Sequence, residues 1–76
     1  MTPVTIIDTR GLSCPLPVLK VRKIMRSAAP GAAAEILATD PLAEQDVRAY
    51  CEASACAFVS VERLEGGVLR MVIQKR

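Results

Sequence analysis

The sequence predicts an α+β protein: a two-layer α/β sandwich in which two helices cover one face of a four-stranded mixed sheet. Three observations predict this fold. The elements follow the order strand, helix, strand, helix, strand, strand (βαβαββ), each helical segment has one apolar stripe, and polar and apolar residues alternate in the last two strands. Packing both helices on one face is the economical way to bury both stripes. The 76 residues allow one domain, positions 1–76.

The first strand and the first helix flank a loop that contains Cys14. A β-branched run predicts a strand over residues 4–8, which ends in a turn at Arg10-Gly11. A helix is expected over about residues 15–28, because proline is tolerated at the first helical position and Pro30-Gly31 stops the helix. Cys14 is therefore expected near the N-cap of this helix.

The first helix presents different chemistry on its two sides. One side of the helical wheel is an apolar core stripe made of Pro17, Val18, Val21, Ile24, Met25 and Ala28. The opposite side is basic, with Lys20 on its border, and consists of Arg22, Lys23 and Arg26. Leu16 and Leu19 fall outside the core stripe, one turn from Cys14. They are either indifferent surface or a docking patch for a partner.

The second half of the chain supplies a strand over residues 34–39, a helix that opens at Asp40-Pro41 and ends near residue 54, and strands over residues 57–65 and 68–75. A turn at Gly66-Gly67 joins the last two strands. The buried side of this helix is expected to contain Ala43, Val47, Tyr50 and Cys51, and its solvent side Glu44, Arg48 and Glu52. The open face of the sheet is expected to present Ser60, Glu62, Arg70 and Gln74.

Composition excludes several classes of site. The chain has no histidine, which removes Cys–His dyads, Ser–His–Asp triads and histidine-containing metal sites from a single chain. Its three cysteines are an odd number without Cys-x-x-Cys spacing, so neither a disulfide framework nor a metal or iron–sulfur site is expected. No signal peptide or transmembrane run is visible, so we expect a cytoplasmic protein without membrane contact.

Cys14 is the first candidate for a reactive thiol. A helix N-terminus favours the thiolate, which is the form that reacts. From Arg10 to Arg26 there are five positive charges and no acid, whereas residues 35–52 contain five acids and one arginine, so the positive end of the molecule is expected around Cys14. Because Pro15 and Pro17 supply no N–H, only a moderate lowering of the Cys14 pKa is expected. The alternative is a small buried hydrophobic residue.

The other two cysteines, Cys51 and Cys56, are weaker candidates for a reactive thiol. Cys51 lies in the apolar stripe of the second helix and is expected only to pack. Cys56 follows that helix, where an exposed thiol would resolve a disulfide or accept sulfur from Cys14. Nothing local activates Cys56, which favours plain packing for it as well.

Residues 8–20, DTRGLSCPLPVLK, closely resemble the signature of the TusA/SirA family of small sulfur-carrier proteins. The Cys-Pro-x-Pro element after Arg-Gly-Leu is highly specific. The resemblance continues through Pro30-Gly31, residues 38–41, Asp46 and the closing hairpin, and so spans essentially the whole chain. One departure is that many relatives carry Gly-His where this chain has Ala55-Cys56. If that histidine matters to transfer in any branch of the family, the mechanism here differs.

The resemblance implies the same sandwich and a sulfurtransferase activity in which Cys14 carries sulfane sulfur as a persulfide. By the same correspondence the site is framed by Arg10, Gly11, Pro15 and Pro17, with Lys20 as a supporting basic residue. It also implies a sulfur donor, such as a cysteine desulfurase or a rhodanese, and a downstream protein with a sulfur-accepting cysteine. The pathways served in the family include tRNA thiolation, molybdenum-cofactor maturation and sulfur oxidation. We expect a monomer without a cofactor and with little stand-alone turnover.

Two functions without sulfur chemistry stay open on the sequence. A basic helix on a small sandwich, a fold that resembles the C-terminal domain of bacterial translation initiation factor three, is compatible with RNA binding through Arg22, Lys23 and Arg26. The lack of surface aromatics for base stacking argues against direct nucleic-acid binding. The other function is regulation by docking on a protein through Leu16 and Leu19.

Overall fold

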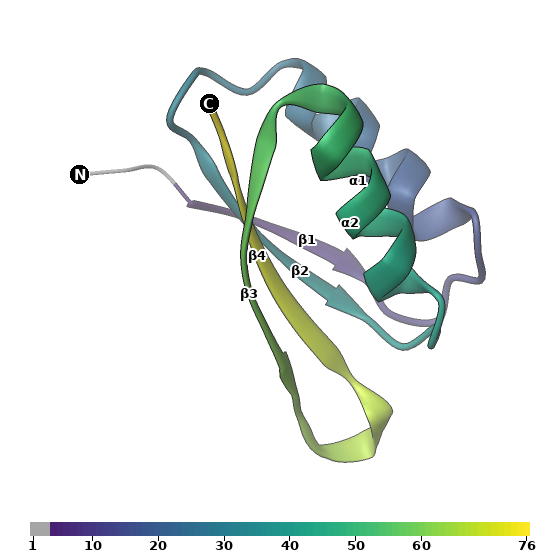
Figure 1. Cartoon of the computed structure of the whole chain (residues 1–76). Helices are drawn as coiled ribbons and strands as arrows, with labels where there is room; N and C mark the ends of the chain where they lie inside the picture. Colours follow the sequence, from purple (N-terminus) through teal and green to yellow (C-terminus); the bar gives the residue numbers. More distant parts are fainter. Residues whose placement is uncertain (1–3) are drawn as a thin grey trace.

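A computed structural model describes residues 4–76, and in it two helices pack on one face of a four-stranded sheet (Figure 1). The elements in chain order are β1 (Val4–Thr9), α1 (Leu16–Arg26), β2 (Ala33–Ala38), α2 (Ala43–Ser54), β3 (Cys56–Arg63), the 3-10 turn η1 (Glu65–Gly67) and β4 (Leu69–Lys75). The predicted α+β class, the order βαβαββ and the mixed sheet are confirmed.

The sheet has the strand order β1-β2-β4-β3, with β1 parallel to β2 and β4 antiparallel to both of its neighbours. Because parallel strands end at the same edge of a sheet, the loop that follows β1 and the loop that follows β2 are neighbours. This adjacency positions the site described below. The predicted turn between β3 and β4 leaves the sheet at this same edge, since Leu69 of β4 pairs with Ala38 of β2, and in it Gly66 and Gly67 adopt φ of +72° and +73°.

The core between the sheet and the helices is built from aliphatic side chains, as expected for a chain with one tyrosine and one phenylalanine. The buried cluster consists of Ile7, Val21, Met25, Ala34, Ile36, Ala38, Ala43, Val47, Cys51, Cys56, Met71 and Ile73. Tyr50 and Phe58 are half-buried and pack at its margin. Lys75 on β4 donates hydrogen bonds to the carbonyls of Met25 and Ala28, and so satisfies backbone acceptors at the end of α1.

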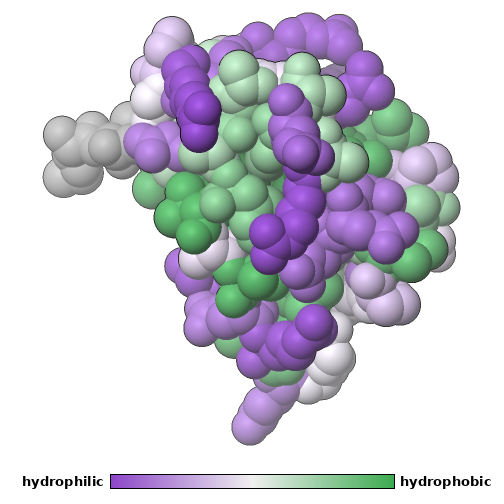
Figure 2. All heavy atoms as spheres, in the orientation of Figure 1, coloured by the Kyte–Doolittle hydropathy of each residue, from purple (hydrophilic) through white to green (hydrophobic). Residues whose placement is uncertain are grey.

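The face of the sheet away from the helices carries both polar and apolar side chains, because Val4 and Ile6 of β1 are 60% and 64% exposed on it. Ser60 and Glu62 are exposed there, and Arg70 pairs with both Glu62 and Glu35. On the side seen in Figure 2, a central group of hydrophobic residues is bordered by hydrophilic ones. No helix within residues 4–76 is long and apolar enough to cross a membrane.

The helices start later than predicted. Helix α1 has Pro15 as its N-cap and begins at Leu16, so Cys14 precedes the cap instead of forming it. Helix α2 begins at Ala43, because the carboxylate of Asp40 accepts the N–H of Leu42 at 2.8 Å and forms a turn before the helix. Helix α1 also ends two residues early, at position 26.

Candidate functional site around Cys14

Two hydrogen bonds connect the Cys14 loop to the loop after β2. The N–H of Gly11, which has φ of +82°, donates to Thr39 Oγ1 at 2.9 Å. The N–H of Cys14 donates to Asp40 Oδ2 at 2.7 Å. Asp40 thus holds the backbone of Cys14 with one oxygen and that of Leu42 with the other, and these bonds lower the pKa of the Asp40 carboxyl. The position of Cys14 is therefore fixed by both loops.

The thiol of Cys14 is exposed and donates a hydrogen bond to the carboxylate of Asp46, with 2.9 Å between Sγ and Oδ2. Asp46 belongs to the first turn of α2 and is half-buried. The reactive candidate on one loop is therefore in contact with an acid from the other helix, 32 positions further along the chain.

The predicted lowering of the Cys14 pKa is wrong. The hydrogen bond to Asp46 raises the pKa of the Cys14 thiol, and partial desolvation and the negative charges of Asp46 and Asp40 act in the same direction. The prediction failed because Cys14 lies before the N-cap of α1, where its thiol contacts Asp46 of α2 and its backbone N–H contacts Asp40 of the preceding loop. Positive charge was expected around Cys14, but the charged side chains that act on its thiol are the acids Asp46 and Asp40.

The two predicted supporting cations bind Asp8 instead. Arg10 donates to both carboxylate oxygens of Asp8, at 2.9 and 2.8 Å, and this pairing holds the pKa of Asp8 down at about 2. Lys20 donates to the backbone carbonyl of Asp8 at 2.8 Å. Arg10 and Lys20 thus fasten the end of β1 to its loop and to α1.

The two prolines of the predicted frame have different positions. Pro15 is exposed, follows Cys14 through a cis peptide bond and is the N-cap of α1. Pro17 is buried and anchors the first turn of α1 in the core. Pro17 therefore fixes the start of α1 through burial in the core, while Pro15 lies at the surface next to Cys14 in the chain.

Three leucines are exposed on the elements that flank Cys14. Leu16 and Leu19 on α1 are 50% and 46% exposed, and Leu42 at the start of α2 is 46% exposed. Leu42 joins this group through Asp40, whose carboxylate binds the N–H groups of both Leu42 and Cys14. The expected position of Leu16 and Leu19 outside the core is confirmed. The three basic residues of α1, Arg22, Lys23 and Arg26, are exposed as well.

Comparison with known proteins assigns this site to a family. The family model described as "Sulfurtransferase TusA" matches residues 5–75. The chain belongs to the TusA family. The Cys-Pro-x-Pro element that carried the resemblance in the sequence lies within the matched residues.

Individual relatives of this TusA-family chain cover nearly all of it. A protein of Archaeoglobus fulgidus is 43% identical over 68 residues, which span 90% of this chain and 88% of that protein. The sulfur carrier protein TusA of Allochromatium vinosum is 30% identical over 91% of this chain and 90% of its own length. A crystal structure of a SirA-like protein from Desulfitobacterium hafniense has the same fold, with a TM-score of 0.80 over 93% of this chain and 95% of that one, at 21% identity.

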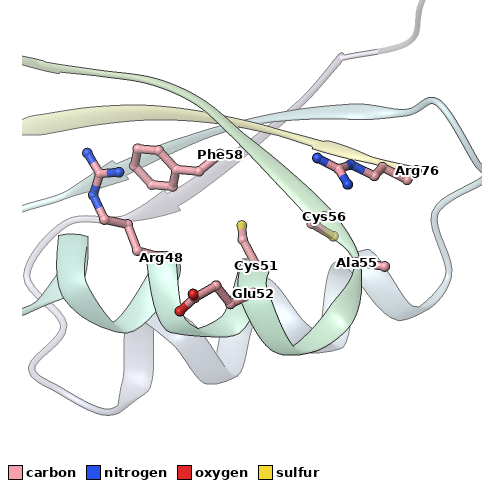
Figure 3. Close-up of a pocket in the computed structure, with 7 residues that line it drawn as sticks. All are labelled: Arg48, Cys51, Glu52, Ala55, Cys56, Phe58 and Arg76. Carbon is pink, nitrogen blue, oxygen red and sulfur yellow. The ribbon is translucent and has the colours of Figure 1, made fainter.

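The other two cysteines of this TusA-family chain are buried. Cys51 is 3% exposed, as predicted, and burial together with the nearby Cys56 raises its pKa to about 11. Cys56 is 8% exposed, so the exposed position considered for it is wrong: it is the first residue of β3 and packs in the core. Both line a depression of about 550 Å³ together with Arg48, Glu52, Ala55, Phe58 and Arg76 (Figure 3).

Sequence reasoning missed the acids that contact Cys14. Asp40 was expected only to open the second helix, and Asp46 entered only as part of the resemblance. A signal for both was present, because parallel pairing of the first two strands brings the loops after them together and places the first turn of α2 beside Cys14. Within residues 4–76, no group of three cysteine, aspartate or glutamate side chains is arranged to hold a metal ion.

Proposed function

We propose that this TusA-family protein is a sulfur carrier that binds sulfane sulfur as a persulfide on Cys14 and relays it to a thiol of a partner. The observation that carries this proposal is the exposure of Cys14 on a loop whose backbone is fixed by Asp40. Both halves of a relay need access, because a donor must reach the thiol and an acceptor must later reach the terminal sulfur. Of the three cysteines, Cys51 and Cys56 lack that access.

The proposed chemistry moves one sulfur atom between cysteines. Sγ of Cys14 attacks the terminal sulfur of a donor persulfide, a new S–S bond forms, and the electron pair of the old S–S bond leaves with the donor thiolate. In the second half, a partner thiolate attacks the terminal sulfur and Cys14 is released. Neither half requires a resident cofactor, and turnover depends on the two partners.

We propose that the donor and the acceptor dock on the surface around the thiol. The exposed leucines Leu16, Leu19 and Leu42 supply apolar area there, and the exposed cations of α1 continue this surface along the helix. Exposed leucines beside a reactive group favour a protein partner, since exposed apolar patches bordered by polar residues mark protein-interaction sites. A cysteine desulfurase or a rhodanese is the expected class of donor.

The test is mass spectrometry of the protein after incubation with cysteine and a cysteine desulfurase, or with thiosulfate and a rhodanese. The expected result is a gain of one sulfur atom on the Cys14 peptide, which is absent in Cys14→Ser and retained in Cys56→Ser. Absence of any gain with both donors contradicts the proposed function. Gain in Cys14→Ser on another cysteine contradicts the assignment to Cys14.

A further inference from the structure

The hydrogen bond between Cys14 and Asp46 raises a question for the relay. A thiol that already ionises needs no base, but the contacts of Cys14 favour its protonated form. An attack by this sulfur therefore requires that its proton leave. The group in contact with that proton is the Asp46 carboxylate, 2.9 Å from Sγ. This distance is within the reach required of a general base.

The charged groups around the thiol leave Asp46 free for this role. Asp40 in the loop before α2 binds two backbone N–H groups with its two oxygens. On the side of β1 and α1, Arg10 and Lys20 are engaged by Asp8. Arg22 of α1 lines the same groove as Asp46, between α1 and α2. Within residues 4–76, Asp46 forms no ion pair, and its side-chain hydrogen bond is the one from Cys14.

We propose that Asp46 is a catalytic residue of sulfur loading, whose carboxylate takes the proton of Cys14 as Sγ attacks the donor. This inference rests on the proposed sulfur-carrier function and adds the base for its first half. Because a carboxylate is a much weaker base than a thiolate, the proton stays on sulfur in the free carrier. It moves to Asp46 only as the lone pair of Sγ is committed to the new S–S bond.

The step balances without a further reagent. The donor R–S–S–H loses its terminal sulfur to Cys14, the electron pair of its S–S bond goes to R–S⁻, and Cys14 becomes Cys14–S–S–H. Cys14 sulfur is oxidised as donor sulfur is reduced. Asp46 holds the proton that Cys14 lost and passes it to the leaving thiolate, directly or through water, which restores the carboxylate.

The test compares wild type with Asp46→Asn, which keeps the shape of the side chain but is not a base. Glu52→Gln is the matched control, because it removes the same charge from the exposed side of the same helix. The equilibrium readout is the thiolate absorbance near 240 nm during a pH titration, with the Cys14→Ser signal subtracted. The kinetic readout is the rate at which glutathione persulfide loads Cys14, measured by mass spectrometry of quenched samples.

The two readouts are expected to move in opposite directions. In Asp46→Asn the titration of Cys14 moves to lower pH, since the negative charge of a carboxylate is lost. Loading at pH 7 nevertheless slows by roughly 10-fold or more, where general-base catalysis typically contributes about 10²–10⁴-fold. At high pH, where Cys14 is a thiolate in both proteins, the loading rates converge. Glu52→Gln changes neither the Cys14 titration nor the loading rate appreciably, since Glu52 is exposed and is not among the groups that shift the Cys14 pKa.

Loading by Asp46→Asn at the wild-type rate or faster at pH 7 overturns the catalytic role, because Asp46 then only restrains the thiol. A constant rate deficit at every pH also overturns it, since a merely structural effect does not vanish when the thiol is ionised. If wild type itself gains no sulfur from any donor, the proposed function fails and this inference with it. Loading in wild type with unchanged kinetics in the variant defeats only the role of Asp46.

Discussion

The loop that carries Cys14 and the segment around Cys51 and Cys56 hold sulfur in two different environments. Cys14 is exposed, and its proton is held mainly by a hydrogen bond to Asp46. Cys51 is buried, and its proton is held mainly by desolvation, which raises its pKa to about 11. The direction of the pKa shift is the same, but its cause differs.

The cause determines what the sulfur can do. A hydrogen bond to a side chain is broken by moving that side chain or by transferring the proton, whereas desolvation is relieved only by opening the core. A raised thiol pKa therefore does not by itself prevent reaction at Cys14. Accessibility and a carboxylate in contact with the sulfur distinguish Cys14 from the two cysteines in the core.

The largest expected difference between the two environments is in alkylation. Iodoacetamide under native conditions should modify Cys14 on the order of 100-fold faster than Cys51 or Cys56, because the buried thiols react only when the structure opens. Since the pKa of Cys14 is raised, its thiolate fraction grows as pH rises past the ordinary cysteine range, and its rate should still increase above pH 9. Peptide mass spectrometry measures the alkylation rate of each of the three cysteines. Equal labelling of Cys56 and Cys14 would contradict the burial of Cys56 and so the difference between the two environments.

Replacing a buried cysteine should change the free energy of unfolding more than replacing Cys14, the reverse of the order expected for alkylation. Cys51→Ala removes a side chain from the packed core and is expected to lower the free energy of unfolding by about 1–2 kcal/mol. Cys14→Ala changes an exposed loop and is expected to stay within about 0.5 kcal/mol of wild type. Urea denaturation of both variants gives the comparison. A larger loss for Cys14→Ala would mean that the contact between Cys14 and Asp46 also holds the Cys14 loop against α2.

Most of the fold could be predicted because its signals are local. The apolar stripe of α1, with Val21 and Met25 buried, and the turn at Gly66-Gly67 follow from periodicity and turn chemistry. Helix starts were less accurate, since Asp40 has two acceptor oxygens and its turn with Leu42 competes with capping.

The chemistry of the site was only half predictable. Cys14 is marked by its motif, but its partners Asp40 and Asp46 are 26 and 32 positions away in the chain. A charge count along the sequence placed positive potential near Cys14, because it could not show that Arg10 and Lys20 would bind Asp8. Strand pairing decides which loops meet, and the local charge follows from that pairing.

The backbone between the two buried cysteines permits the smallest and most specific test. Ala55 ends α2 with φ of +58°, donates its N–H to the carbonyl of Cys51 and immediately precedes Cys56. The left-handed conformation costs an L residue with a Cβ about 1–2 kcal/mol, whereas glycine adopts it freely but loses more chain entropy on folding. Ala55→Gly is therefore expected to stabilise the protein by about 0.5–1 kcal/mol in urea denaturation, without changing the alkylation rate of Cys14.

Ala49→Gly is the matched control, since the same substitution at an exposed position inside α2 should destabilise by about 1 kcal/mol. Opposite signs for two identical changes isolate the backbone conformation at Ala55 as the cause. If Ala55→Gly destabilises the protein as Ala49→Gly does, the left-handed C-cap is not the strained point of this segment. If Ala55→Gly does stabilise the end of α2, the core around Cys56 opens less often, and alkylation of Cys56 should slow as well.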